Sequence, residues 1–282
     1  GKSQLAIDLA RRFDGAVINA DSMQLYADLT VLTARPQAQE VQDIPHHLFG
    51  ICDAAHRASV AEWLGLAATA IAKVRAAGQL PIIVGGTGMY LQAGLRGIAS
   101  VPDVPADVHQ YCIDLYWKLG GAKFRDALAD YDAEIAARLV DGDSQRLIRA
   151  MGVAIATDRP LSWWQKQPHK NALLGNVVTI AIMPPRPTLY DWINQRFDNM
   201  LTHGAIDEVS ELIARKLDPG LPLMKALGVA PIASFLKGEI TKDDAAFIAK
   251  RDSRRFAKRQ ITWIRNNFNA RITIETKFSE SL

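Results

Sequence analysis

Features that mark several special classes of protein are scarce in this chain. Only 2 of its 282 residues are cysteine, and Cys52 and Cys112 stand far apart, so neither a disulfide framework nor a zinc site is indicated. No apolar run approaches the roughly 20 residues that cross a bilayer, and the first residues lack the basic and apolar regions of a signal peptide. We therefore expect a cytoplasmic protein that does not enter a membrane.

An excess of charge of one sign is also lacking. The chain carries 33 Lys and Arg against 30 Asp and Glu, a formal net charge of +3, which is too small to indicate a polyanionic partner by itself. Its 49% hydrophobic and 22% charged residues are ordinary for a globular protein. The positions of the basic residues are therefore more informative than their sum.

The first residues combine a short phosphate-binding motif with a helical pattern. Gly1-Lys2-Ser3 leads directly into apolar residues spaced along one helical stripe. This sequence matches the end of the GxxxxGK[ST] loop, whose first glycine and preceding strand would stand before Gly1. In such loops the helix-terminal amides and the lysine bind phosphate, and the hydroxyl reaches a magnesium ion.

Two strand–loop–helix units follow in the first hundred residues. The segment 15–21 is predicted to be a buried strand that ends on Asp21. The segment 80–84 is predicted to be another, which leads through Gly85-Gly86-Thr87-Gly88 into a helix. This alternation favours a parallel sheet with crossover helices, in which ligands bind beyond the carboxyl ends of the strands. Asp21 and Thr87 each lie at such an end.

The pattern becomes entirely helical between about 101 and 172. We expect an inserted all-helical domain there, with Trp163 and Trp164 packed inside it, and a catalytic core made of 1–100 and 173–282. Further elements expected in the core are a loop at His46-His47, helices beginning at Ser59, Thr188 and about Thr241, and strands over 177–182 and 271–274.

Basic residues gather at two places. Between Lys250 and Arg265, seven lysines and arginines stand against one aspartate. On a helix, positions 251, 255, 258, 262 and 265 share one face, whereas Phe256, Trp263 and Ile264 can turn inward. A shorter group, Gln145–Arg149, repeats arginine three positions apart. Each group is either a solvated helix face or a surface that binds nucleic-acid phosphates without reading sequence.

Seven motifs are spread in series over nearly the whole chain: Gly1–Ser3, Asp21–Tyr26, Thr33–Pro36, Pro45–His47, Gly85–Tyr90, Asp143–Ala150 and Ala257–Arg265. In this order they resemble the tRNA dimethylallyltransferases, also called tRNA isopentenyltransferases. The resemblance implies an α/β fold, with a P-loop NTPase-like parallel-sheet core and an inserted helical domain that binds tRNA. It also implies that a dimethylallyl group passes from dimethylallyl diphosphate to the exocyclic amino nitrogen of the adenosine adjacent to the anticodon. The protein is expected to act as a monomer on the anticodon stem-loop.

The resemblance further implies roles for single residues. Asp21 and Thr87 match the catalytic residues, with Asp21 as the base that accepts a proton from the adenine amino group. The positions that match diphosphate-binding residues are Gly1, Lys2, Ser3, Arg146 and Arg149, with Ser3 on Mg2+, the expected cofactor. The positions that match tRNA-binding residues are Asp21, Ser22, Met23, Gln24, Gln145, Arg146, Leu147, Ile148, Arg149, Lys258, Arg259, Gln260 and Arg265.

Three other functions are compatible with parts of the sequence. An adenine-nucleotide isopentenyltransferase would share the chemistry, but it would require neither the insert nor the basic terminal helix. A P-loop kinase would share Gly1-Lys2-Ser3, but it would need an ATP-binding arrangement that the sequence does not show. A catalytically inactive RNA-binding protein would keep the basic groups but would not need Asp21 and Thr87.

Overall fold

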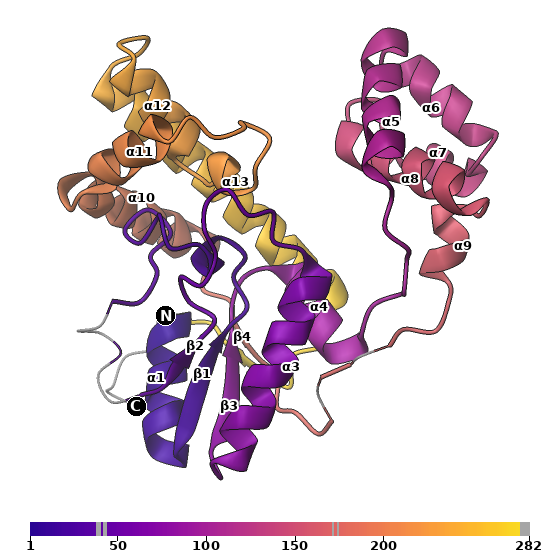
Figure 1. Cartoon of the computed structure of the whole chain (residues 1–282). Helices are drawn as coiled ribbons and strands as arrows, with labels where there is room; N and C mark the ends of the chain where they lie inside the picture. Colours follow the sequence, from indigo (N-terminus) through magenta and orange to yellow (C-terminus); the bar gives the residue numbers. More distant parts are fainter. Residues whose placement is uncertain (38–40, 42–43, 171, 174, 277–282) are drawn as a thin grey trace. The chain divides into compact units, whose positions relative to one another are not determined.

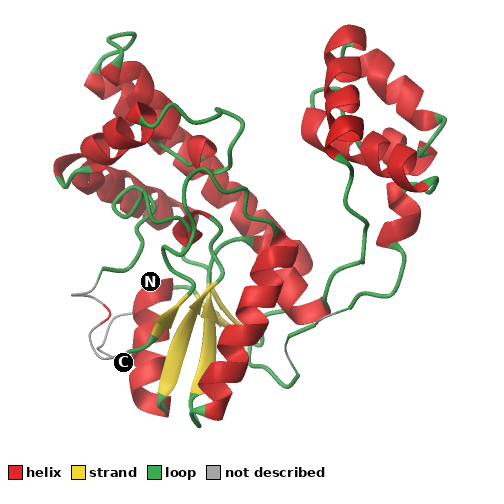
Figure 2. Ribbon diagram, in the orientation of Figure 1, coloured by secondary structure: helices red, strands yellow, loops and turns green. Residues whose placement is uncertain are grey.

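The chain folds into two units. The computed structural model describes residues 1–37, 41, 44–170, 172–173 and 175–276. The first unit, called the core unit here, consists of Gly1–Leu95 and Leu173–Leu282, and the second, the helical unit, consists of Arg96–Ala172. The strands of both sheets belong to the core unit (Figure 2).

The core unit contains a three-stranded parallel sheet in the order β2-β1-β3. Its strands are β1 (Gly15–Asn19), β2 (His46–His47) and β3 (Leu80–Val84). β1 pairs with β3 along its whole length, so that Asn19 lies opposite Val84. A second parallel pair is formed by β4 (Ile180–Ile182) and β5 (Ile272–Ile274). The predicted α/β class with parallel strands is therefore confirmed.

β1 is buried along its whole length because helices cover both faces of the sheet (Figure 1). Ala16 and Ile18 pack against α3 (Val60–Ala76). Val17, which lies between them, packs against α1 (Lys2–Phe13). Since successive side chains of a strand point to opposite faces, neighbouring apolar residues serve two different helices. This explains why the strand is a continuous apolar run without polar alternation.

The order of the elements brings three chain segments to one edge of the sheet. α1 ends at Phe13, its C-cap Asp14 has a left-handed φ of 47°, and β1 begins at the residue after Asp14. The helix therefore runs antiparallel to the strand, and its N-terminus lies at the carboxyl end of β1 (Figure 1). Because β3 is parallel to β1, the segment after β3 reaches the same edge. Lys2, Asp21 and Thr87 all belong to this edge.

Further helices complete the core unit. They are α4 (Gly88–Arg96), α10 (Arg186–Thr202), α11 (Ala205–Ala214), α12 (Val229–Leu236) and α13 (Lys242–Asn267), with short 3-10 turns η1 (Met23–Leu25) and η2 (Leu223–Lys225). The long helix α13 packs against both α10 and α12. Across the described ranges, no helix is long and apolar enough to cross a membrane.

The helical unit is a bundle with its own core. Its helices are α5 (Ala106–Leu119), α6 (Gly121–Ala129), α7 (Ala133–Arg138), α8 (Ser144–Thr157) and α9 (Leu161–Gln165). Phe124, Leu128 and Leu147 are fully buried in this core. The prediction that Trp163 and Trp164 pack inside is wrong for Trp163, because this residue is 40% exposed and the Arg159 guanidinium lies 5.4 Å from the centroid of its ring.

Two predicted helix starts are confirmed by their caps. Ser59 precedes α3, and its hydroxyl accepts the Glu62 N–H at 3.1 Å. Thr241 precedes α13 and forms a complete capping box with Asp244. The predicted start at Thr188 is wrong, because α10 already begins at Arg186 and has a proline in its first turn, where no N–H is needed.

Two predictions about strands required correction. His46-His47, expected to be a loop, forms β2 because it pairs with the buried strand β1. The expected strand over 177–182 is shorter, since only Ile180–Ile182 pairs with the three residues of β5. Val178 is 58% exposed before this pairing begins. In both cases long-range pairing outweighs the local sequence signal.

Candidate active site

A buried amide at the end of β1 fixes the main chain of Asp21. The Asn19 side chain is 0% exposed. Its Nδ2 donates to the carbonyl oxygens of Asp21 (3.0 Å) and Leu48 (2.9 Å), and its Oδ1 accepts the Asp21 N–H at 2.8 Å. Since a buried amide without partners would be costly, this network holds Asp21 through both its N–H and its C=O.

The Asp21 carboxylate has two unlike oxygens. Oδ1 accepts the N–H of Met23 at 3.1 Å. For Oδ2, no hydrogen bond is found among the residues that the structure describes. One oxygen therefore fixes the orientation of the carboxylate, and the other can accept a proton from a bound molecule.

Thr87 is joined to the same turn. Its N–H donates to the carbonyl oxygen of Ala20 at 3.3 Å. Its hydroxyl oxygen accepts the Ser22 N–H at 2.9 Å, and the hydroxyl lies 3.2 Å from the Ser22 hydroxyl, to which it donates. These bonds connect the segments that follow β1 and β3, so the structure brings the predicted residues Asp21, Ser22 and Thr87 together.

The segment Gly85–Gly88 approaches its neighbours too closely for side chains. A Cβ atom would come within 2.5 Å at three of its positions: at Gly85 it would lie 2.1 Å from the Ala20 carbonyl oxygen, at Gly86 2.4 Å from Gln260 Nε2, and at Gly88 2.5 Å from the Trp263 indole. Gln260 Nε2 also donates to the Gly86 carbonyl oxygen at 2.8 Å. The side-chain amide of Gln260, predicted to contact tRNA, is thus engaged with the loop that carries Thr87.

The Asp21 carboxylate acts electrostatically on two cations. Lys2 lies in the first turn of α1, and Arg196 lies on α10. Desolvation lowers the pKa of Lys2, Asp21 opposes this change, and Arg196 adds to it. Desolvation likewise lowers the pKa of Arg196, with Asp21 again opposing. Lys2 and Arg196 are nevertheless partly exposed to solvent. The desolvation therefore comes from the many protein atoms near each side chain, although water still reaches both.

Sequence reasoning missed Arg196. It is a single basic residue on an amphipathic helix, and no local motif marks it. Its effect on the pKa of Lys2 is visible only after folding has brought α10 to the start of α1.

The edge near Lys2 is suited to an anion. The amides of the first turn of a helix have no acceptor within the helix, and the helix dipole is positive there. The first turn of α1 contains no acidic residue that would occupy these amides. Together with Lys2 and Arg196, they form a positively polarised surface of the kind that binds phosphate groups.

Ser3, in the first turn of α1, is the residue expected to hold magnesium. In the described portion of the chain, no three His, Cys, Asp or Glu residues gather as a metal-binding group. Magnesium at phosphate sites commonly takes only one or two protein oxygens and completes its octahedron with phosphate and water. The exposed Ser3 in the first turn of α1 fits that donor set.

The outer face of α13 carries a basic groove of about 540 Å³. Its walls include Arg255, Lys258, Arg259, Thr262, Trp263 and Asn266. For Lys258, Arg259 and Arg265, no ion pair occurs within the described segments. Their charges are therefore free to meet an anionic partner.

Other basic residues of α13 are engaged within the protein. Lys250 pairs with Asp198 at 2.5 Å, and Arg254 donates to the Asn194 side chain at 2.6 Å. Phe256 does not turn inward as predicted: it is 37% exposed, with the Arg259 guanidinium 5.6 Å from its ring centroid. Lys250 and Arg254 are therefore less available to an anionic partner than Lys258, Arg259 and Arg265.

The predicted group Gln145–Arg149 lies on α8 of the helical unit. Arg146 forms an ion pair with Asp143, and Arg149 donates to the Pro102 carbonyl oxygen at 3.4 Å. Leu147 and Ile148 are 0% and 8% exposed, so their side chains belong to the core of the helical unit, and a contact of these two positions with tRNA stays a prediction. The roles of the two arginines in binding diphosphate or tRNA stay predictions.

Comparison with known proteins identifies relatives along most of the chain. A family model described as IPP transferase matches residues 24–267. The tRNA dimethylallyltransferase of Hyphomonas neptunium is 48% identical over 269 residues, which cover 95% of this chain and 85% of that protein.

Solved structures agree with this result. The tRNA isopentenylpyrophosphate transferase of Staphylococcus epidermidis superposes with a TM-score of 0.69 at 30% identity, covering 99% of this chain and 91% of that one. A eukaryotic dimethylallyltransferase acting on tRNA superposes with a TM-score of 0.80 at 27% identity, covering 94% and 67%. The predicted P-loop NTPase-like fold is thereby confirmed. Since both the family model and its relatives extend over most of the sequence, the chain belongs to the IPP transferase family.

Proposed function

We propose that this protein transfers a dimethylallyl group from dimethylallyl diphosphate to the exocyclic amino nitrogen of the adenosine next to the anticodon in tRNA. The observation that carries this proposal is the shared edge at which Thr87 is hydrogen-bonded to Ala20 and Ser22, the two neighbours of Asp21, and at which the Asp21 carboxylate acts electrostatically on Lys2 and Arg196. The relatives named tRNA dimethylallyltransferase, and the solved relative acting on tRNA, support it.

The diphosphate of the donor would bind at the N-terminus of α1. Lys2, Arg196 and the first-turn amides supply the positive charge. As the bond between the dimethylallyl carbon and the diphosphate oxygen breaks, negative charge grows on the diphosphate, and groups already oriented toward it stabilise that charge. Mg2+, held through Ser3 and the phosphate oxygens, would neutralise part of the same charge.

The acceptor step would depend on Asp21. The lone pair of an adenine amino group is delocalised into the ring, so the nitrogen is a weak nucleophile. It becomes effective if its proton passes to a carboxylate while the new nitrogen–carbon bond forms and diphosphate departs. Asp21 Oδ2 is suited to accept that proton, since Oδ1 accepts the Met23 N–H. The adenine must first leave its stacked position in the anticodon loop.

An assay with two acceptors tests the function. The protein is incubated with labelled dimethylallyl diphosphate and either tRNA or adenosine monophosphate, and we expect label in tRNA alone. A tRNA with guanosine in place of the adenosine next to the anticodon is the control and should stay unlabelled. Label in the mononucleotide would indicate an adenine-nucleotide isopentenyltransferase, and label in neither acceptor would contradict a prenyltransferase function.

The groove on α13 leads to a prediction about salt. Replacing Lys258 and Arg259 by Gln should weaken tRNA binding and reduce the slope of log affinity against log salt by roughly 1.5, since each phosphate contact contributes about 0.7 to 0.9. Titrations at several salt concentrations measure the slope. The double variant Lys237→Gln, Lys242→Gln removes the same charge outside the groove and should change the slope less. Equal slopes for the two double variants would mean that the groove is merely solvated.

A further inference from the structure

Glu208 of α11 binds a distant loop of the core unit. Its Oε1 accepts the N–H groups of Thr30 and Val31, both at 2.8 Å, and its Oε2 accepts the N–H of Leu32 at 3.0 Å. Hydrogen bonds from main-chain amides to a carboxylate are charge-assisted and therefore stronger than neutral ones. One side chain thus satisfies three consecutive amides of a loop about 177 positions earlier in the chain.

The same loop fixes the side chain of Gln24. Gln24 Nε2 donates to the carbonyl oxygens of Thr33 (3.0 Å) and Ala34 (2.9 Å). Because both acceptors are carbonyl groups, the orientation of the Gln24 amide is determined. Ala34 has a φ of 51°, a left-handed conformation that a non-glycine residue keeps only when its surroundings hold it. The loop is therefore shaped by its contacts, and Glu208 provides three of them.

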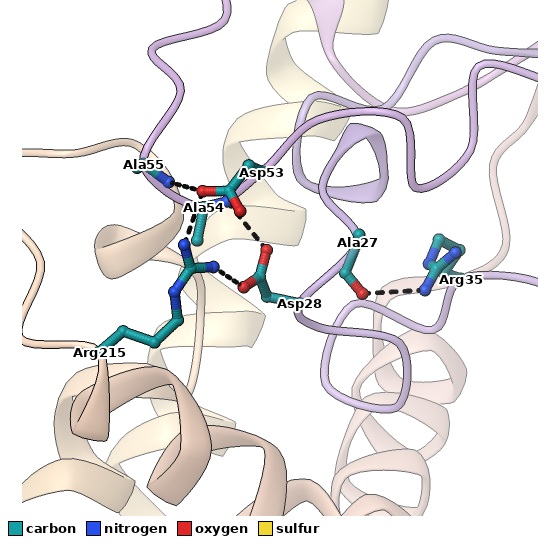
Figure 3. A network of polar contacts seen from close by, with 7 residues as sticks. All are labelled: Ala27, Asp28, Arg35, Asp53, Ala54, Ala55 and Arg215. Carbon is teal, nitrogen blue, oxygen red and sulfur yellow. Dashed lines mark hydrogen bonds and ion pairs between the residues drawn. The ribbon is translucent and has the colours of Figure 1, made fainter.

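Arg215, which follows α11, binds two segments outside the 30–34 loop (Figure 3). Its guanidinium forms ion pairs with Asp28 and with Asp53, the latter at 2.7 Å. Asp28 also accepts the Ala54 N–H at 2.9 Å. Glu208 therefore binds the loop itself, whereas Arg215 fixes Asp28, two positions before the loop, and joins it to the segment around Asp53.

Gln24 lies three positions after Asp21, and its carbonyl oxygen accepts the Gly50 N–H at 2.9 Å. We propose that Glu208 is a positioning residue that acts through the 30–34 loop on Gln24. It supports the reaction with tRNA but does not contribute to the binding of dimethylallyl diphosphate. Among the described residues, no hydrogen bond or ion pair joins this loop to the donor cations, Lys2 and Arg196. This inference rests on the proposed function.

The test separates tRNA use from donor binding. Glu208→Gln keeps the size of the side chain but places an N–H donor against amide donors. We expect its kcat/KM for tRNA to fall roughly tenfold or more, since small displacements of a positioned group are costly. Its Kd for dimethylallyl diphosphate should stay within about twofold of the unmodified protein. Glu211→Gln, the same change on the exposed side of α11, is the matched control and should leave both values unchanged.

A double-mutant cycle with Gln24→Ala identifies the route of the effect. If Glu208 acts through Gln24, the kcat/KM for tRNA of the double variant should lie within about twofold of that of the more impaired single variant. Should Glu208→Gln fail to fold, Glu208→Asp, which keeps the charge but shortens the reach, replaces it in the cycle.

The outcomes are distinct. Three results would each overturn the inference while leaving the proposed function intact. The losses in kcat/KM of the two single variants could multiply fully in the double variant, kcat/KM of Glu208→Gln could be unchanged, or Glu208→Gln could lose donor affinity by the same factor as kcat/KM. An unmodified protein that transfers no label to tRNA would overturn the proposed function, and this inference with it.

Discussion

Replacing Asp21 by Asn is expected to lower the rate of prenyl transfer on the order of a hundredfold or more while tRNA binding persists. Asparagine has nearly the same shape, and its side-chain oxygen can still accept the Met23 N–H. It cannot accept a proton from the adenine amino group. Single-turnover measurements give the rate of the chemical step, and equilibrium binding at the same salt concentration gives the affinity for tRNA.

Asp14→Asn is a matched control for this variant. Asp14 caps the C-terminal end of α1, at the edge of the sheet opposite Asp21, and we expect normal turnover after the same chemical change there. Near-normal turnover by Asp21→Asn would exclude this carboxylate as the base. Loss of tRNA affinity by a similar factor would mean that Asp21 mainly binds RNA.

Arg196→Gln is expected to raise the Kd for dimethylallyl diphosphate by roughly tenfold to a hundredfold, because hydrogen bonds to charged groups contribute about 1.5 to 3 kcal/mol each. The change removes one of the two cations on which the Asp21 carboxylate acts. Arg186→Gln, in the first turn of the same helix, removes the same charge and should leave this Kd unchanged. A normal Kd in Arg196→Gln would contradict a role in donor binding.

The pH dependence of the same variant gives an independent check. Arg196 helps to lower the pKa of Lys2, so its removal should raise that pKa toward the ordinary lysine value. Lys2 carries its charge below its pKa, and donor affinity that depends on this charge is lost as the pH rises through the pKa. The alkaline loss of donor affinity should therefore move to higher pH in Arg196→Gln.

Local signals in the sequence were sufficient for much of the core. β3 was predicted at its observed bounds because a short apolar run is followed directly by glycines. α3 and α13 were predicted because their caps involve residues only three positions apart. The edge that carries Asp21 and Thr87 followed from the alternation of strands and helices, since parallel strands end on the same side.

Interactions over long distances in the chain were not predictable from the sequence alone. Arg196 and Glu208 are single charged residues on helices and Arg215 directly follows one, and each acts on residues more than 150 positions away. Nothing in their immediate neighbourhood distinguishes them from solvated surface charges. Leu147 and Ile148 illustrate a different difficulty. A sequence motif consists of consecutive residues, but on a helix some of these residues face the protein core and are buried.

The closely packed glycines of the Gly85–Gly88 segment determine which substitutions evolution can tolerate there. At Gly86, the opposing atom is the end of the Gln260 side chain, so a shorter residue at position 260 could make room for an added methyl group. At Gly85, the opposing atom is the main-chain oxygen of Ala20, which no exchange of side chains can remove. We therefore expect natural variation at position 86 to be accompanied by variation in the C-terminal helix, whereas position 85 has no such compensating partner.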